Sequence, residues 1–155
     1  MDASGYLGLF GESGVALSDE EWLEQANAHL PPNLTALKAR YLDGSREERW
    51  LRASYEPGSA ARNFIQISGG TIAEMLDQTA THCGSFVTGN PCPTISMTVT
   101  ILRAGTSPTY TAIGRVVKLT HATAVLSADL EDESGRSIAT AIVISQPITD
   151  LNRLT

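Results

Sequence analysis

Hydrophobic and polar residues alternate strictly over one stretch in the second half of the chain. In TISMTVTIL (residues 94–102), every second residue from Ile95 to Ile101 is apolar, and Thr or Ser stands between them. A period of two is typical of a strand with one buried face. Three more strand-like runs with short connections follow, at residues 109–119, 122–130 and 137–145. Together they predict consecutive antiparallel strands.

The first part of the chain combines a weakly patterned region with a clear helix start. Residues 1–16 are rich in Gly and Ser, and we expect them to be flexible. In LSDEEWLEQANAHLPP, Ser18 can cap a helix, and Glu21 stands three residues later at the capping-box position. Because Pro31-Pro32 ends that helix, we place an outer packing helix at residues 18–30.

Two strand-like runs and one long helical segment lie in between. LKARYLD and RWLRASYEP flank Asp43-Gly44, a dipeptide that favours a hairpin turn. Residues 69–84 then follow a helical pattern that ends near Gly84. One long helix and about five or six mainly consecutive antiparallel strands predict an α+β fold.

Composition and charge narrow the function classes. A chain of 155 residues fits a single domain, residues 1–155. Its net charge of −6 argues against a nucleic-acid binder, which needs cations to neutralise phosphates. No stretch approaches the length of a membrane span, and the N-terminus does not resemble a signal peptide. We therefore expect a cytoplasmic protein, in which Cys83 and Cys92 are buried thiols rather than a disulfide.

The helical segment opens on two glycines. The N-terminus of a helix leaves N–H groups unpaired and carries partial positive charge. Gly69 and Gly70 let a ligand approach that backbone closely, so this helix start is a candidate donor site for a carbonyl oxygen that gains negative charge. A simple tight turn into the helix would explain the same two glycines.

One carboxylate on this helix is a second candidate. Asp77 stands among the apolar residues of the helix, where a carboxylate is costly to bury without partners. Glu74 lies on a neighbouring face and is the weaker candidate, while Thr81 can hydrogen-bond a water or merely pack. A solvent-exposed Asp77 is the structural alternative.

The segment from Gly69-Gly70 to Asp77, followed by PTISMTVTILRAG and DLEDESGRSIATAIV, resembles hotdog-fold thioesterases of the phenylacetate-pathway (PaaI) type. The resemblance covers about residues 48–146 and implies a hotdog core over residues 35–147, with the sheet wrapped around the central helix. It implies hydrolysis of an acyl-CoA thioester at a subunit interface, in at least a homodimer and by preference a homotetramer. Neither a metal nor a redox cofactor is implied, because coenzyme A enters as part of the substrate.

The resemblance also assigns roles to individual residues. Gly69 matches the glycine whose N–H polarises the thioester carbonyl, and Asp77 matches the carboxylate that activates water or attacks directly. Thr94 matches the hydroxyl that supports this carboxylate. Two positions depart from the pattern: Ser68 replaces a histidine or glutamine before the glycines, and Arg62 replaces an asparagine or glutamine seven residues before Gly69.

One residue further on, Asn63 offers a polar amide that could fill the second of these positions after a shift of one residue. We also name Ser68, Gly70 and Thr81 as substrate-binding candidates. Arg103 and Arg115 are candidates for the coenzyme A phosphates, although plain solvation would explain both.

Helix geometry limits how Gly69 and Asp77 can act together. Eight residues of helix advance by about 12 Å. Gly69 and Asp77 of one chain therefore cannot both touch one thioester carbon. If both act in catalysis, Gly69 of one subunit must face Asp77 of another, as in a two-fold dimer with antiparallel helices.

Two other functions remain open. Asp77 and His82 have the D-x4-H spacing of (R)-specific enoyl-CoA hydratases, but five helical residues turn the side chains about 140° apart. We expect His82, like His29 and His121, to be a packed or surface residue. A non-catalytic acyl-CoA binder is the second alternative, because Ser68 and Arg62 alter the site.

Overall fold

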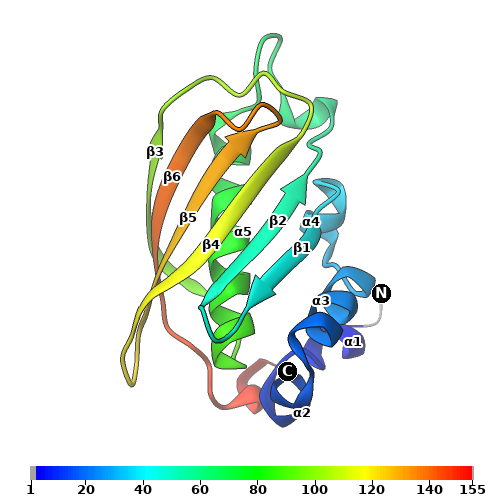
Figure 1. Cartoon of the computed structure of the whole chain (residues 1–155), viewed down its shortest axis with the longest axis vertical. Coiled ribbons are helices and arrows are strands. Elements are labelled where there is room, and N and C mark those ends of the chain that lie inside the picture. The colour runs from blue at the N-terminus through cyan, green and yellow to red at the C-terminus, as the bar shows by residue number, and fades with distance from the viewer. Residues whose placement is uncertain (1–2, 155) are drawn as a thin grey trace.

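Six strands form one antiparallel sheet, and a long helix, α5, lies across one of its faces (Figure 1). This computed structural model describes residues 3–154. The strand order in the sheet is β1-β2-β4-β5-β6-β3. The strands are β1 (Arg40–Ser45), β2 (Trp50–Tyr55), β3 (Thr94–Ile101), β4 (Tyr110–Leu119), β5 (Ala124–Asp132) and β6 (Ser137–Ser145). The predicted α+β class, with six strands and one long helix, is confirmed.

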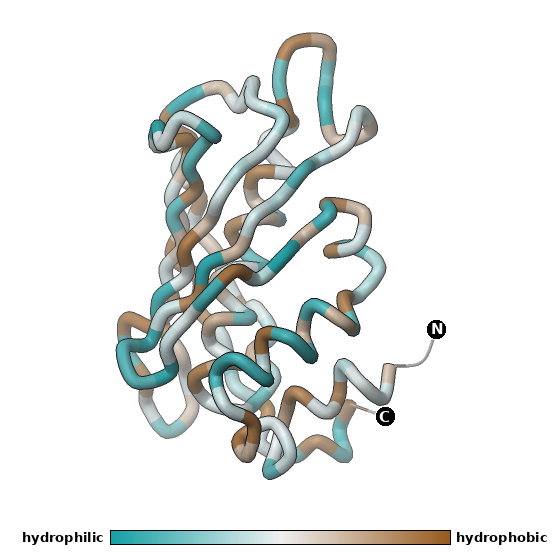
Figure 2. The backbone as a smooth tube through the Cα atoms, turned by 45° about the vertical axis from the view of Figure 1, so that its right-hand side comes forward, coloured by the Kyte–Doolittle hydropathy of each residue, from teal (hydrophilic) through white to brown (hydrophobic). Residues whose placement is uncertain are grey.

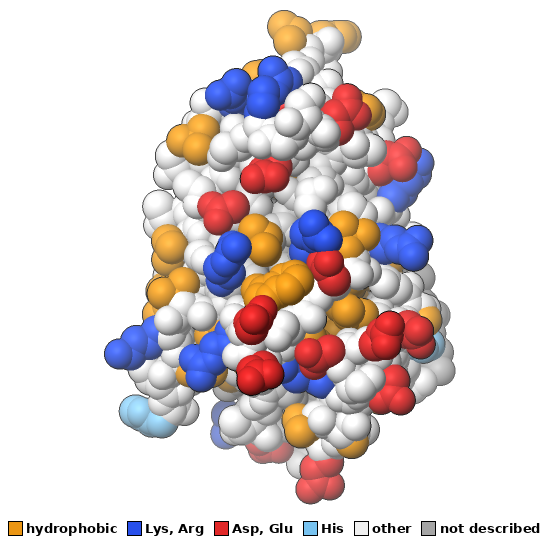
Figure 3. Space-filling model, in the orientation of Figure 1, with side chains coloured by type: hydrophobic (Ala, Val, Ile, Leu, Met, Phe, Trp, Pro, Cys, Tyr) orange, Lys and Arg blue, Asp and Glu red, His pale blue; other side chains and the backbone are white. Residues whose placement is uncertain are grey.

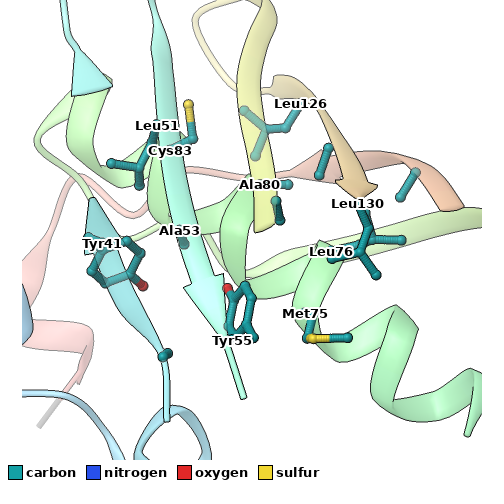
Figure 4. Packing of buried hydrophobic residues seen from close by; sticks show 14 of the residues in the cluster. Tyr41, Leu51, Ala53, Tyr55, Met75, Leu76, Ala80, Cys83, Leu126 and Leu130 are labelled. Atoms are coloured by element: carbon teal, nitrogen blue, oxygen red, sulfur yellow. The ribbon is translucent and has the colours of Figure 1, made fainter. Parts of the chain in front are cut away.

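Helix α5 (Gly69–Thr88) supplies one side of the hydrophobic core. Met75, Leu76 and Ala80 point from it toward the sheet, where they meet side chains of β2 and β5 (Figure 4). The helix ends at Gly89, which has a left-handed backbone (φ +71°), so the predicted end near Gly84 is wrong. Gly84 is instead a packing position, because a Cβ there would lie 3.0 Å from the Cys92 sulfur.

The first hairpin turns later than the sequence suggested. Asp43 and Gly44 lie inside β1, where Gly44 pairs with Leu51, and the turn occupies residues 46–49. Gly44 serves close packing rather than a turn, because a Cβ there would lie 2.9 Å from the Trp50 carbonyl oxygen. The predicted turn at Asp43-Gly44 is therefore wrong by a few residues.

The N-terminal segment is helical and packed, in contrast to the flexibility expected for residues 1–16. Its helices gather beside one end of α5 (Figure 1). Leu9 and Phe10 are buried, and the Trp22 indole N–H donates to the Leu9 carbonyl at 3.1 Å. Residues 1–2 lie outside the described part of the chain. The four short helices are α1 (Ser4–Leu7), α2 (Gly11–Ala16), α3 (Asp19–Ala28) and α4 (Pro32–Ala36).

The predicted outer helix at residues 18–30 agrees closely with α3. The Glu21 N–H donates to the Ser18 hydroxyl at 3.1 Å, and the Ser18 N–H donates to the Glu21 carboxylate at 2.8 Å. This reciprocal pair is the capping box that the sequence predicted.

Strand β3 is exposed on both faces. It lies at an edge of the sheet and pairs with β6. The expected buried face is not buried within the chain, since Ile95, Met97 and Ile101 are 60%, 37% and 48% exposed. An apolar face on an open edge strand is an unprotected surface of a kind that soluble proteins normally cover.

A second exposed apolar element is the loop that precedes α5. It protrudes from the end of the molecule away from the short helices, and its tip is hydrophobic (Figure 2). The side chains at the tip are Phe64, which is fully exposed, and Ile65, which is 80% exposed.

Arg46 ties the N-terminal helices to the core. Its guanidinium donates to the carbonyls of Leu17, Gly14 and Phe86 at 2.6, 3.1 and 2.9 Å. It also pairs with Asp19 at 3.2 Å and lies 4.9 Å from the centre of the Phe86 ring. Bonds from a charged donor that is mostly shielded from water are stronger than ordinary surface pairs.

We expect Arg46→Met to lower the free energy of unfolding by about 2–3 kcal/mol, because three carbonyls lose a charged donor. Arg52→Met is the matched control, since the Arg52–Asp43 ion pair is about half exposed and should contribute at most about 1 kcal/mol. Urea titrations of both variants measure the difference. Equal destabilisation by the two substitutions would contradict this role of Arg46.

Candidate active site

The Asp77 carboxylate is bound to the first residue of β3. Asp77 is half-buried on α5, and the Thr94 hydroxyl donates to its Oδ1 atom at 2.5 Å. A hydroxyl bonded to an ionised carboxylate at this distance makes a charge-assisted bond. The bond fixes the orientation of the carboxylate and leaves Oδ2 available to a water or a substrate.

The start of α5 presents two unpaired backbone donors. Within residues 3–154 no acceptor is found for the N–H of Gly69 or Gly70. Ser68 is the N-cap, and its hydroxyl accepts from the Thr71 N–H at 3.1 Å. All three residues are exposed, so this helix start is open to a ligand.

Gly69 and Asp77 lie near opposite ends of β3. A Cβ at Gly69 would lie 3.3 Å from the Ile101 side chain, whereas Asp77 is bonded to Thr94. Helix α5 therefore runs antiparallel to β3, and its two candidate groups are about 12 Å apart along the helix. Within one chain they do not form a common site.

Arg62 and Asn63 serve the loop before α5. The side-chain amide oxygen (Oδ1) of Asn63 accepts from the N–H groups of Ile65 and Gln66, both at 2.9 Å, and so holds the loop tip. The Arg62 guanidinium donates to the Ser107 carbonyl. Both residues lie toward the Gly69 end of α5, and neither is bonded to Asp77.

A pocket of about 540 Å³ opens beside Asp77. On α5 it is lined by Asp77, Gln78, Thr81, His82 and Ser85, and Thr94 lies beside them. The Thr81 hydroxyl donates to the Asp77 backbone carbonyl at 2.8 Å and not to its carboxylate. The remaining lining residues come from both ends of the chain and from the segment before β3, namely Tyr6, Leu7, Phe10, Pro91, Cys92, Pro93, Ile148 and Leu154.

Sequence reasoning missed the N-terminal part of this pocket. The stretch GYLGLF places Tyr6, Leu9 and Phe10 at positions i, i+3 and i+4, a spacing that could have indicated a packed helical turn. The surrounding Gly and Ser residues hid this pattern.

The sequence model of the thioesterase superfamily matches residues 66–139, which include Gly69, Asp77 and Thr94. No functionally curated protein matches the sequence.

The fold is similar to solved structures at TM-scores near 0.7. The PaaI protein of the E. coli phenylacetic acid degradation operon is 17% identical with a TM-score of 0.73, over 81% of this chain and 91% of that one. A phenylacetic acid degradation-related protein from Ralstonia eutropha is 20% identical with a TM-score of 0.71, over 76% and 90%. A hypothetical thioesterase protein from Streptococcus pneumoniae with coenzyme A is 17% identical with a TM-score of 0.67, over 74% and 90%.

The chain has the hotdog fold of these structures, and its segment 66–139 matches the thioesterase superfamily. The family resemblance and the hotdog fold expected from the sequence are therefore confirmed. This match supports a thioester hydrolase as the enzyme class.

His82 is a packed residue, as expected. Its Nδ1 atom donates to the Gln78 carbonyl at 2.8 Å, so Nε2 carries the lone pair that accepts from the Tyr6 hydroxyl at 3.2 Å. Burial lowers the pKa of His82 to about 4. His82 and Asp77 nevertheless line the same pocket, although their side chains were expected to point apart.

The two candidate arginines lie in different places. Arg115 lies on the outer face of the sheet, opposite α5, near Trp50 and 3.9 Å from Asp129. Figure 3 shows basic and acidic side chains intermixed on the outer face of the sheet. Arg115 is therefore remote from Asp77. Arg103 is exposed just after β3, at the Ile101 and Gly69 end.

Among residues 3–154, His, Cys, Asp and Glu side chains form no group of three that could share a metal ion. Over the same residues, no helix has both the length and the apolar character needed to cross a bilayer. Cys83 and Cys92 are free buried thiols, as expected.

Acid should destabilise the fold through His82. Between about pH 6.5 and pH 4 the unfolded chain binds a proton at this residue that the folded chain does not, so stability falls as the pH falls. A pKa of about 4 in the folded chain, against 6.5 in the unfolded chain, corresponds to a loss of about 3 kcal/mol in the free energy of unfolding. Urea unfolding across this range should show the loss in the wild type and a flatter profile in His82→Gln.

His121→Gln is the control, because His121 is exposed in the turn between β4 and β5. An unchanged pH profile in His82→Gln would contradict a buried neutral His82.

Proposed function

We propose that the protein hydrolyses the thioester bond of an acyl-CoA, with Asp77 as general base or nucleophile. The observation that carries this proposal is the Asp77 carboxylate, held by Thr94 at the mouth of a pocket in a chain whose segment 66–139 matches the thioesterase superfamily. A partly buried carboxylate with one fixed oxygen and one available oxygen is suited to act on a water or a carbonyl carbon.

The proposed reaction begins with the thioester carbonyl at the start of α5. The carbonyl oxygen accepts from the Gly69 N–H, and Gly70 supplies a second free N–H nearby. Asp77 takes a proton from a water that attacks the carbonyl carbon, or it attacks directly to form an anhydride that water then cleaves. In both routes the C–S bond breaks and coenzyme A leaves as the thiol. Thr94 keeps the carboxylate oriented.

Two subunits complete each proposed site. If the β3 strands of two copies pair antiparallel about an axis at Thr98, Thr94 of one copy lies close to Ile101 of the other. Asp77 lies at Thr94 and Gly69 at Ile101, so this pairing brings Asp77 of one copy to Gly69 of the other. The open edge of β3 and its exposed apolar side chains support a homodimer. A homotetramer rests on the family resemblance alone.

Coenzyme A belongs to the substrate in this proposal, and no metal or redox cofactor takes part. The S. pneumoniae neighbour, whose structure contains coenzyme A, supports such a substrate. Arg103 lies at the Gly69 end and is the better placed of the two arginines to meet coenzyme A phosphates.

The hydratase alternative is less well supported. A hydratase pair needs a histidine that can exchange a proton, whereas both ring nitrogens of His82 are already bonded, to Gln78 and to Tyr6. A silent acyl-CoA binder would keep the pocket and lack turnover.

Replacement of the carboxylate tests the reaction. We expect Asp77→Asn to lower thiol release from acyl-CoA thioesters by about 10²-fold or more, as for loss of a general base or nucleophile. Glu74→Gln is the matched control: it changes a carboxylate one turn earlier on α5 that accepts from Asn33 instead of facing the pocket. Thiol release from a panel of short, medium, long-chain and aryl acyl-CoAs measures both.

An Asp77→Asn variant with wild-type turnover would overturn the catalytic assignment. Absence of turnover by the folded wild type on every thioester would instead favour the silent binder.

Mixed dimers test the shared site. Gly69→Pro removes the proposed donor N–H but keeps the helix, because proline suits the first helical position and Ser68 already has an extended backbone (ψ 152°). Asp77→Asn and Gly69→Pro should each abolish most activity alone. After denaturation and joint refolding they should regain about a quarter of the wild-type rate, since half the dimers contain one intact site.

Refolding each variant alone is the control for the mixing step. If Gly69 and Asp77 served the same site within one chain, every site in the mixture would contain a lesion and no activity would return.

A further inference from the structure

We propose that the N-terminal segment around Tyr6 and Leu7 forms the acyl-chain wall of the active site and selects an uncharged acyl group of medium length. This inference rests on the proposed thioester hydrolysis. It assigns a role to a segment that lies outside the part matched by the superfamily, residues 66–139.

The pocket connects the reacting end to this wall. Asp77 and Thr94 lie at one end, and the pocket continues along α5 past Thr81 toward Ser85. Thr81 and Ser85 are small, so they leave room between α5 and the facing residues Tyr6, Leu7 and Phe10. The N-terminal and C-terminal ends of the chain lie side by side there (Figure 1), and Ile148 and Leu154 extend the apolar wall.

The Tyr6 side of the wall is fixed to α5. The Tyr6 hydroxyl donates to His82 at 3.2 Å, and its ring stacks edge-on against Phe10 at 5.3 Å between centroids. Gln25 also donates to the Gly5 carbonyl at 2.9 Å, which anchors α1 to α3. A wall held from two sides can set a limit on substrate size.

The length of the pocket sets the size class. Eight helical residues separate Asp77 from Ser85, a distance of about 12 Å along α5. An extended chain of single bonds advances about 1.2 Å per bond, so this depth holds about ten bonds of an acyl chain. A volume of about 540 Å³ is compatible with such a group.

The charge of the pocket sets the chemical class. Among the described residues 3–154, its lining contains no Lys or Arg, and Asp77 is the one acidic residue. His82 adds no positive charge near neutral pH, because burial lowers its pKa to about 4. An acyl group that ends in a carboxylate would therefore face Asp77 without a cation to pair with, which disfavours dicarboxylic acyl groups.

Two substitutions in the wall change the free volume of the pocket in opposite directions. Leu7→Trp adds bulk at a side chain that is 39% exposed and lines the pocket, so folding should tolerate it. Tyr6→Ala removes the ring that bounds the pocket. Val15→Trp is the matched control, because Val15 is 63% exposed on α2 and does not line the pocket.

The readout is kcat/KM for acetyl-, hexanoyl-, decanoyl-, palmitoyl- and succinyl-CoA. We expect a maximum near hexanoyl or decanoyl in the wild type, and little turnover of succinyl. Leu7→Trp should lower the decanoyl value about tenfold or more and leave the acetyl value within about twofold, because one methylene that fits badly in an apolar pocket alters discrimination by about 10–200-fold. Tyr6→Ala should move the maximum toward palmitoyl, and Val15→Trp should reproduce the wild-type profile.

Unchanged chain-length profiles in both wall variants of an active enzyme would overturn the inference while leaving thioester hydrolysis intact. Efficient turnover of succinyl-CoA would overturn the charge argument. If the wild type releases no thiol, calorimetric binding of the same acyl-CoAs to the wild type and to Leu7→Trp decides the question. Equal affinities across the series would then refute the acyl wall.

Discussion

The hydrogen bond from Thr94 to Asp77 joins the central helix to the open edge of the sheet. Because Thr94 begins β3, this bond fixes where the carboxylate lies relative to the strand that faces away from the rest of the chain. The other features of the candidate site can be described by their position relative to this bond. The pocket opens beside the bonded carboxylate, and the unpaired N–H groups of α5 lie at the far end of the same strand. A strand that separates two complementary groups and has one free edge is suited to pair with a copy of itself.

Local signals in the sequence predicted the elements that depend on nearby residues. The capping box of Ser18 and Glu21 and the start of α5 at Gly69 were found because both depend on contacts within a few positions. The glycines were misjudged where distant packing decides. Gly44 and Gly84 have turn-forming sequence neighbours, yet each is needed for close approach to another element, the backbone of Trp50 and the side chain of Cys92. No pattern along the chain reports such contacts.

Part of the candidate site was likewise predicted from the sequence, and part of it was not. Gly69, Asp77 and Thr94 were identified by the family resemblance, and the structure brings Asp77 and Thr94 together. Strand periodicity indicates which face of β4 carries Arg115: Gly114 and Val116 face α5, so Arg115 faces away from it. The pocket wall from Tyr6 to Phe10 was missed because composition, rich in Gly and Ser, outweighed a short apolar spacing that only tertiary packing makes meaningful.

The two exposed apolar features lie where the two-subunit site would need them. In the proposed antiparallel pairing of β3, the loop before α5 would extend past Gly69 and beyond Asp77 of the other copy, toward the pocket along α5. A fully exposed Phe64 at a loop tip is unfavourable for an isolated chain. It becomes reasonable if a neighbouring subunit covers it, and Asn63 holds the tip in a defined turn rather than leaving it mobile. The Asn63 side chain would then act in positioning this loop, which accounts for an amide at this point in the chain without a direct role on the thioester.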